Sequence, residues 1–254
     1  MLIYFVSIFF IGDIDKSYGQ QSVTDWKQHA LPKEEDSISK YNNSVVSWLV
    51  SINTTGQVTA ENKVAKFPSV DTLPFIPVFK TNEAYRFRGF RTVKKVSDGY
   101  LLGFNKGEFG GSLHWFSFNG DSTYQISNGL VNYIFEHKSK IYIAHGLAHM
   151  GSDDGGINQM LLTNGKWTIG TGADLTYNPE VFLPIKNGVI IVTSKTVLLF
   201  DGLQKIKKIK KDGFWEVLYP QSAVLQNNDL YIGMRGGIYK INLKSRKEEW
   251  LMPY

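Results

Sequence analysis

The 254-residue chain contains no cysteine. It can therefore form no disulfide bond, no thiolate-bound zinc or iron–sulfur site, and no cysteine nucleophile. It also lacks a Gly-x-Ser-x-Gly nucleophile elbow and a phosphate-binding loop. With 43% hydrophobic and 20% charged residues, the composition is that of a folded globular chain rather than a disordered one.

Long apolar runs are also missing. The run at residues 2–11 is too short to cross a bilayer as a helix, so no transmembrane segment is expected. Ser17 and Gly19 are small residues two apart, the pattern that signal peptidase recognises, so residues 1–19 are predicted to be a signal peptide. The protein would then be periplasmic or secreted. Because no Lys or Arg precedes the run, the alternative is a buried first strand.

Helical periodicity is weak throughout, since no stretch has twelve residues of 3.6-residue apolar spacing. A different pattern recurs instead, in which a polar turn precedes a β-rich run that ends in a small residue. Taking Tyr100, Ile141, Val189 and Leu230 as equivalent positions, the spacings are 41, 48 and 41 residues. The four copies lie at residues 98–103, 140–144, 187–192 and 229–233.

Each copy has further predicted strands around it. One strand precedes it, at 92–96, 131–135, 181–185 and 223–225, and another follows it, at 113–118, 157–162, 196–200 and 238–241. A fourth strand would carry Tyr124, Trp167, Trp215 or Trp250. Turns such as Asn119-Gly120 and Asn164-Gly165 suit hairpins, because Asn and Gly tolerate positive φ.

Four short antiparallel strands in a unit of 40 to 48 residues are typical of a β-propeller blade. The segments 107–111 and 231–239 look like the hairpin turns of propellers with degenerate repeats. The chain thus resembles secreted bacterial β-propeller repeat proteins. It lacks the Trp-Asp and Gly-His dipeptides and the Asp-box of better-defined propeller families, so the resemblance implies a fold and no particular activity.

The predicted fold class is therefore all-β, a single propeller domain over residues 20–254 with five four-stranded blades. Four blades would cover residues 89–127, 128–175, 179–218 and 221–253. Residues 20–88 would supply the fifth, with a hairpin at 45–63, strand candidates at 75–79 and 84–90, and a loop at 33–37. Trp26 followed by Leu31-Pro32 resembles the ends of the last two blades, which suggests that the N-terminal strand closes the ring.

Ligands usually approach a propeller at the loops of one face, where the turns between second and third strands lie. These turns present ligand-face candidates from three blades: Lys106, Glu108, Phe109, Lys195 and Arg235. Glu108 lies between glycines and is a candidate general base or sugar-binding carboxylate. It could equally be the solvated tip of a turn.

The longest of these turns, residues 145–156, holds two histidines and an acidic pair. His145, His149, Asp153 and Asp154 are candidate ligands of a divalent metal, and His145 and His149 are candidate catalytic residues with Glu108. The glycine-rich stretch is also ordinary turn sequence, in which the i, i+4 histidine spacing of a helical metal site has no meaning. No cofactor is otherwise indicated.

Five lysines fall within residues 205–211, and their summed charge equals the formal net charge of the chain, +5. This cluster lies where an outer strand should begin, and edge strands use Lys to prevent pairing with other chains. The rest of the surface is close to neutral, so specific nucleic-acid binding is not expected.

Two functions remain open from the sequence. The first is an exported, monomeric, non-enzymatic propeller that binds a protein or glycan ligand. The alternative is a hydrolase- or lyase-type enzyme, with or without a metal, that uses Glu108, His145 and His149.

Overall fold

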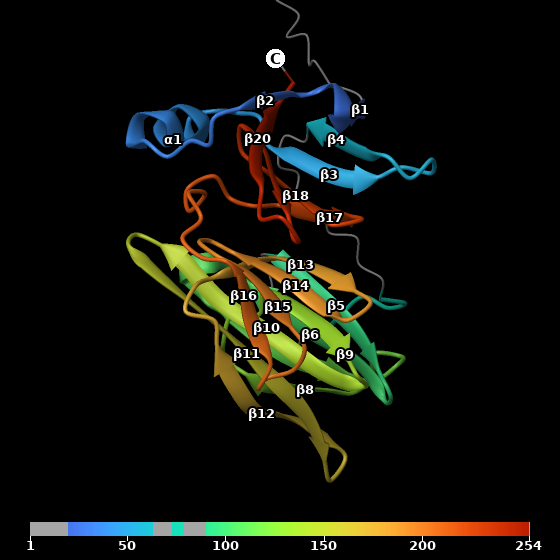
Figure 1. The fold of residues 1–254 in the computed structure, drawn as a ribbon. Coiled ribbons are helices and arrows are strands. Elements are labelled where there is room, and N and C mark those ends of the chain that lie inside the picture. Colours follow the sequence, from blue (N-terminus) through green and yellow to red (C-terminus); the bar gives the residue numbers. More distant parts are fainter. Residues whose placement is uncertain (1–19, 63–72, 79–89, 254) are drawn as a thin grey trace, which may run out of the picture.

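Antiparallel sheets make up nearly all regular structure in the computed structural model, which describes residues 20–62, 73–78 and 90–253. Three sheets contain four strands each, paired in chain order (Figure 1). The first contains β5 (Phe90–Val96), β6 (Gly99–Asn105), β7 (Gly111–Phe116) and β8 (Thr123–Ser127). The second contains β9 (Tyr133–His137), β10 (Lys140–His149), β11 (Ser152–Thr163) and β12 (Lys166–Asp174). The third contains β13 (Pro179–Ile185), β14 (Gly188–Thr193), β15 (Val197–Phe200) and β16 (Ile206–Lys210).

A fourth sheet combines both ends of the described chain. It contains β17 (Ser222–Gln226), β18 (Asp229–Met234), β19 (Gly237–Asn242) and β20 (Glu248–Met252), and β2 (Lys27–His29) forms its outer strand. The pairing of β2 with β20 is antiparallel, with Gln28 opposite Leu251. The N-terminal segment therefore extends the last sheet.

A smaller sheet lies beside the fourth one (Figure 1). It has the order β1 (Gln21–Ser22), β4 (Val58–Asn62) and β3 (Trp48–Ile52). The one α-helix of the described residues, α1 (Glu35–Asn42), leads into this sheet. It is far too short to span a membrane, and none of the helices described qualifies as a candidate span.

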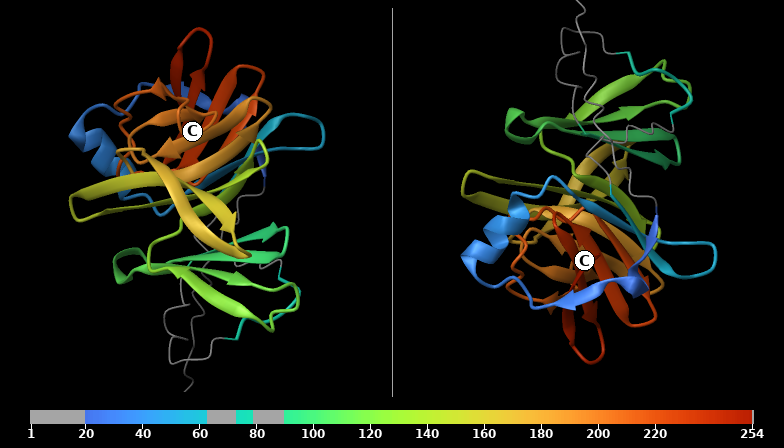
Figure 2. Two further views of the ribbon diagram at one scale, coloured as in Figure 1. Left: turned by 90° about the horizontal axis from the view of Figure 1, so that it is seen from below. Right: turned by 90° about the horizontal axis from the view of Figure 1, so that it is seen from above.

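Apolar side chains join neighbouring sheets face to face. Val96 and Leu113 of the first sheet pack with Trp167 of the second, and Tyr142 of the second packs with Phe200 of the third. Trp215 packs with Trp250 where the third sheet meets the fourth. Trp48 packs with Ile238 where the fourth sheet meets the smaller one. Figure 2 agrees: β5–β8 and β17–β20 lie at opposite ends of the molecule, with β9–β16 between them.

The all-β class and the several four-stranded antiparallel sheets confirm that part of the prediction. Of residues 33–37, predicted as a loop, 33 and 34 precede α1, whereas 35–37 form its first turn. Glu35 and Asp36 stabilise its first turn through the helix dipole, while Ile38 and Tyr41 pack against the core around Trp250. Residues 75–78 form no strand. The predicted signal peptide and most of the strand candidate at 84–90 lie outside the described residues.

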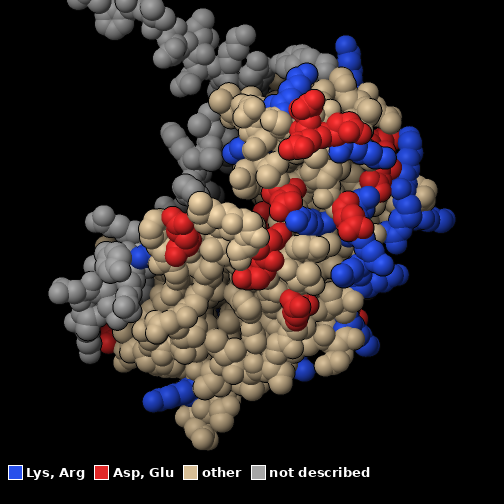
Figure 3. Space-filling model, turned by 90° about the vertical axis from the view of Figure 1, so that its left-hand side faces the viewer, with Lys and Arg blue, Asp and Glu red and all other residues tan. Residues whose placement is uncertain are grey.

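The lysine cluster forms an outer strand, as expected. Residues 206–210 become β16, which among the described strands pairs only with β15. Trp215 was predicted to lie in this strand but follows it, in a turn that buries the indole completely. Lys210 pairs with Glu248 at 2.9 Å, and on the face drawn in Figure 3 basic side chains are intermixed with acidic ones.

Candidate functional site

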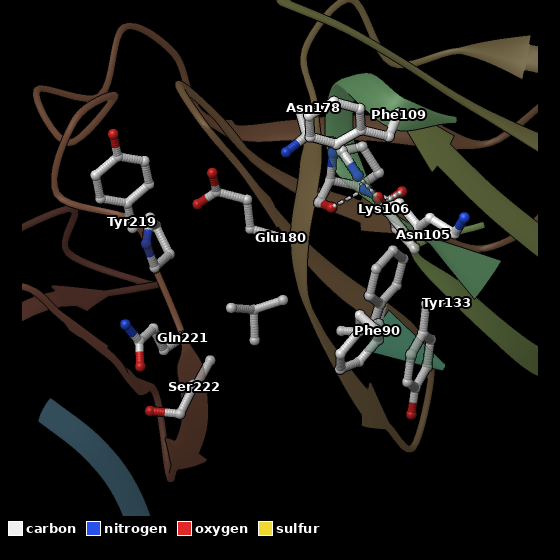
Figure 4. Close-up of a pocket in the computed structure, with 17 residues that line it drawn as sticks. Phe90, Asn105, Lys106, Phe109, Tyr133, Asn178, Glu180, Tyr219, Gln221 and Ser222 are labelled. Carbon is white, nitrogen blue, oxygen red and sulfur yellow. Dashed lines mark hydrogen bonds between the residues drawn. The ribbon is translucent and has the colours of Figure 1, made fainter. Parts of the chain in front are cut away.

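A pocket of about 1150 Å³ opens where the first strands of the sheets begin. Its wall takes residues from the start of β5, β9, β13 and β17 and from the turn after β6. Aromatic rings supply much of the apolar surface, namely Phe90, Phe109, Tyr133, Phe182 and Tyr219. The pocket is therefore a meeting point of four sheets, built by residues far apart in sequence (Figure 4).

Side-chain amides form a connected row along this wall. Asn105 donates from Nδ2 to Oδ1 of Asn132 at 2.9 Å, and Asn132 donates from Nδ2 to Oδ1 of Asn178 at 2.8 Å. Asn132 also donates to the carbonyl of Pro179 at 3.0 Å. Each amide keeps further donor or acceptor capacity, so the row presents fixed polar groups to the pocket.

Glu180 is the one acidic residue among the described residues that line the pocket. It lies at the start of β13, and its Oε2 is buried without a hydrogen-bond partner among those residues. Burial and the nearby negative charge of Asp153 raise the pKa of Glu180 to about 8, although a hydrogen bond with Asn178 opposes the shift. Glu180 thus retains a proton at neutral pH unless a cation neutralises it.

Residues 145–156, predicted as a loop, form instead the end of a long hairpin. Strands β10 and β11 pair as far as His149 opposite Ser152. Glycines occur here because a Cβ at Gly155 would lie 2.1 Å from the carbonyl oxygen of Tyr177. The glycines therefore allow close packing against the segment before β13.

The hairpin brings together two of the predicted site residues. His149 Nε2 lies 2.8 Å from Glu108 Oε2, and both side chains are about half exposed. Glu108 belongs to a 3₁₀ turn (Gly107–Phe109), and this turn also carries Phe109 to the pocket. Lys106, just before it, lines the same pocket. The pair fastens the hairpin tip to a turn of the pocket rim.

The predicted metal set does not converge. Residues opposite one another in an antiparallel pair share a face, so His145, His149 and Asp154 lie on one face of the hairpin and Asp153 on the other. His145 Nε2 contacts Asn158 Oδ1 at 2.8 Å, while Asp154 is exposed. Within the described residues no group of three or more His, Asp or Glu could hold a metal ion.

Asp153 instead accepts two hydrogen bonds from neighbouring segments of the protein. Its Oδ1 accepts the backbone N–H of Asn178 at 2.8 Å, and its Oδ2 accepts the hydroxyl of Ser194 at 2.6 Å. Because Asn178 immediately precedes β13, these bonds fix the strand that bears Glu180. Asp153 is thus a positioning residue of the pocket wall.

The remaining ligand-face candidates lie outside the pocket lining. Lys195 pairs with Glu216 at 3.0 Å and lies over the ring of Tyr177, 5.5 Å from its centroid. Arg235 donates to the carbonyl of Asn42 at 2.9 Å, at the end of α1, and stacks 4.7 Å from the centroid of Tyr219. Both cations are therefore engaged in contacts between elements.

Sequence reasoning missed the polar residues at the centre of the pocket. A signal for three of them exists, because an amide residue precedes the first strand in three successive repeats, at Asn132, Asn178 and Gln221. Glu180 had a weaker signal, as a lone charge at the edge of an apolar strand. Its burial depends on contacts with distant segments, which the repeat pattern does not reveal.

No protein-family model matches the sequence, and no curated protein matches it. Solved structures with some similarity include β-1,2-mannobiose phosphorylase from Listeria innocua, with 15% identity and a TM-score of 0.34 over 65% of this chain and 57% of that one. Another is the extracellular domain of a hybrid two-component system from B. thetaiotaomicron, with 15% identity and a TM-score of 0.42 over 85% of this chain and 33% of that one. The extracellular domain of a one-component system from the same organism has 12% identity and a TM-score of 0.33 over 79% of this chain and 36% of that one. The chain spans about one third to just over half of these proteins, and the similarity is confined to a distant likeness of fold.

Proposed function

We propose that the chain is an exported, non-enzymatic β-propeller that binds a glycan in the pocket bearing the amide row. The observation that carries the proposal is the pocket itself: about 1150 Å³ in volume, walled by aromatic rings and crossed by Asn105, Asn132 and Asn178. A concave, mainly apolar site with a few convergent polar groups is the usual form of a small-ligand site. Amides and aromatic rings together suit a sugar, which offers hydroxyl groups and apolar C–H faces.

The propeller architecture rests on the serial packing of the sheets. Four apolar clusters join the β5–β8, β9–β12, β13–β16, β17–β20 and β1–β4–β3 sheets in that order. The addition of β2 to β20 resembles the strand exchange by which propellers close. Five blades in a ring would place the first strands around a central channel, where the pocket lies.

The sharpest test uses two exposed phenylalanines as a matched pair. Phe109 lines the pocket and is 79% exposed, whereas Phe118 is 46% exposed and is not part of the lining. Neither replacement by Ala should impair folding. A panel of soluble oligosaccharides is first screened by thermal shift, and binders are titrated calorimetrically.

Phe109→Ala should weaken binding of any oligosaccharide that binds by about fivefold, because an aromatic contact contributes on the order of 1 kcal/mol. Phe118→Ala should leave binding unchanged. Absence of oligosaccharide binding, or equal loss in both variants, would overturn the proposal.

The alternative, a hydrolase- or lyase-type enzyme, was based on Glu108, His145 and His149. Glu108 and His149 pair with each other at the surface, and His145 contacts Asn158 instead. Glycoside hydrolysis generally requires two carboxyl groups at the bond, whereas Glu180 is alone among the described lining residues. Mass spectrometry of a bound oligosaccharide after prolonged incubation should therefore find it intact, and cleavage products would favour the enzyme.

Export is tested separately. Fractionation of producing cells, followed by N-terminal sequencing, should find a mature protein that begins at Gln20 outside the cytoplasm. Retention of residues 1–19 in a cytoplasmic protein would contradict this part of the proposal.

A further inference from the structure

Glu180 differs from every other polar group on the pocket wall. The neighbouring amides bond to one another, but the buried Oε2 of Glu180 has no hydrogen-bond partner among the described residues. In Figure 4 its carboxylate extends towards the side of the pocket where Tyr219 lies. A buried polar atom without a partner is costly, and its retention in a pocket points to a partner supplied by a ligand.

The charges around Glu180 indicate what that partner is. Asp153 lies behind the same wall, close enough to disfavour ionisation of Glu180, and is held by Asn178 and Ser194. Lys195 is near Asp153 but pairs with Glu216. The other titratable groups of the described lining are Lys106, Tyr133 and Tyr219, and Figure 4 shows Lys106 and Tyr133 across the pocket from Glu180. The charge that acts on Glu180 is therefore the negative charge of Asp153, and it favours a cationic partner.

A low-dielectric cavity strengthens this field. The free pocket can relieve the cost of the Glu180 charge by holding a proton. A cationic ligand would relieve it better, since it provides both the opposite charge and hydrogen-bond donors. The aromatic lining adds to the effect, because ring faces attract cations.

We infer that the pocket selects glycans that carry an unsubstituted, protonated amine, with Glu180 as the counter-ion of the ammonium group. The inference rests on the proposed glycan-binding function and names the ligand class. The amide row would bind the hydroxyl groups, while Glu180 would distinguish an amino sugar from its N-acetylated form.

The experiment compares two probes that differ only at the nitrogen. Calorimetric titrations use the β-1,4-linked glucosamine trisaccharide and its fully N-acetylated counterpart near pH 7, where the amine still carries charge and Glu180, with its pKa raised to about 8, releases its proton more readily than at lower pH. The wild-type protein should prefer the amine by about tenfold or more, the range of a charge-assisted hydrogen bond. Glu180→Gln keeps the shape of the side chain and should abolish the preference.

Glu108→Gln is the matched control. It removes a carboxylate close to the pocket rim but outside the lining. It should keep the preference for the amine. If Glu108→Gln removes the preference as fully as Glu180→Gln does, general charge rather than a counter-ion is responsible, and the inference fails.

Two further probes, spermidine and triglycine, separate the possible sources of an amine. Glu180-dependent binding of either one without binding of the trisaccharide would keep the counter-ion role but overturn the glycan as its source. Equal binding of both trisaccharides in wild type and Glu180→Gln would leave the proposed glycan function standing and overturn the inference. Failure of every probe to bind would overturn the inference, and the proposed glycan function would fall as well only if no member of the oligosaccharide panel bound.

Choline carries a permanent charge and gives an independent readout. Glu180 must lose its proton to pair with a cation, so the affinity for choline should rise between about pH 6 and pH 8, by on the order of tenfold or more. Glu180→Gln should show no such rise. A flat wild-type profile would contradict the counter-ion role.

Discussion

Two residues in the β13–β16 region, Trp215 and Glu180, differ in whether their buried side-chain polar atoms have a hydrogen-bond partner. Trp215, after β16, is fully buried, and its only side-chain polar atom donates to the carbonyl of Thr193 at 2.9 Å. Glu180, at the start of β13, keeps a buried oxygen without a partner among the described residues. The side-chain polar atom of Trp215 has a partner within the protein, whereas Oε2 of Glu180 has none among the described residues. We therefore expect Trp215 to serve packing between sheets and Glu180 to serve the proposed binding.

The comparison also separates stability from binding. The aromatic ring of Trp215 packs 4.9 Å from that of Tyr239, in the cluster that joins the third sheet to the fourth. The pocket wall holds one buried side-chain atom without a partner among the described residues, Oε2 of Glu180, and Glu180 lines a pocket rather than a packed cluster. Substitutions near Trp215 should thus affect mainly the free energy of unfolding, and those at Glu180 mainly its pH dependence and ligand binding.

The largest expected effect is that of Trp215→Ala. Loss of a fully buried indole and its hydrogen bond should lower the free energy of unfolding by about 3–5 kcal/mol. Chemical denaturation measures the change. Leu162→Ala, which truncates a side chain that is 45% exposed, should remain within about 0.5 kcal/mol of wild type. A loss below about 1 kcal/mol for Trp215→Ala would show that this junction does not determine stability.

The second effect concerns pH. The folded-state pKa of Glu180 is raised to about 8 from 4.5, so the folded protein binds an extra proton between these values. Its contribution to the free energy of unfolding therefore decreases as pH rises through this window, by at most about 1.4 kcal/mol per pH unit. Asp201 and Glu249 have lowered pKa values and act at lower pH.

Denaturation series from about pH 5 to pH 8 should therefore show a decline in wild type and a flatter curve in Glu180→Gln. Glu108→Gln should keep the wild-type slope. If the slopes of wild type and Glu180→Gln agree, the environment of Glu180 is less restrictive than its burial indicates.

The difference between these regions also explains what the sequence could reveal. Strands such as β14 and β18 were predictable because local alternation and turn residues recur with the repeat. The helix α1 was not, because it has only eight residues and depends on Ile38 and Tyr41 packing against the core. The β10–β11 hairpin was mistaken for a loop because Gly155 serves a close contact with Tyr177 that only the fold creates.

The same limit applies to the site. Lys106 and Phe109 line the pocket, and both follow a strand end that the repeat predicts. Arg235 and Lys195 lie outside the lining, because their partners Asn42 and Glu216 come from other elements. Glu180 obtains its properties from burial and from Asp153, two features that arise only when β11 and β13 become neighbours.

A smaller effect is expected at the centre of the amide row. Asn132→Ala removes the partner of Asn105 Nδ2 and of Asn178 Oδ1, both of which lie in partly buried bonds. The free energy of unfolding should fall by about 1–2 kcal/mol, less than for Trp215→Ala because the freed groups can bind water from the pocket. Gln28→Ala, at an exposed position of β2, is the control and should have no measurable effect. A neutral Asn132→Ala would mean that the row is maintained for binding alone.

The smallest effect should come from the pair of Glu108 and His149. Both side chains are about half exposed, so solvent screens their 2.8 Å contact. A double-mutant cycle of Glu108→Gln and His149→Ala should give a coupling energy of about 0.2–1 kcal/mol that disappears at high salt. The pair nevertheless joins the hairpin tip to the turn that carries Phe109. A coupling energy well above this range, or a loss of trisaccharide affinity as large as that of Phe109→Ala, would contradict a purely structural role. The pair would then have to be counted as part of the binding site.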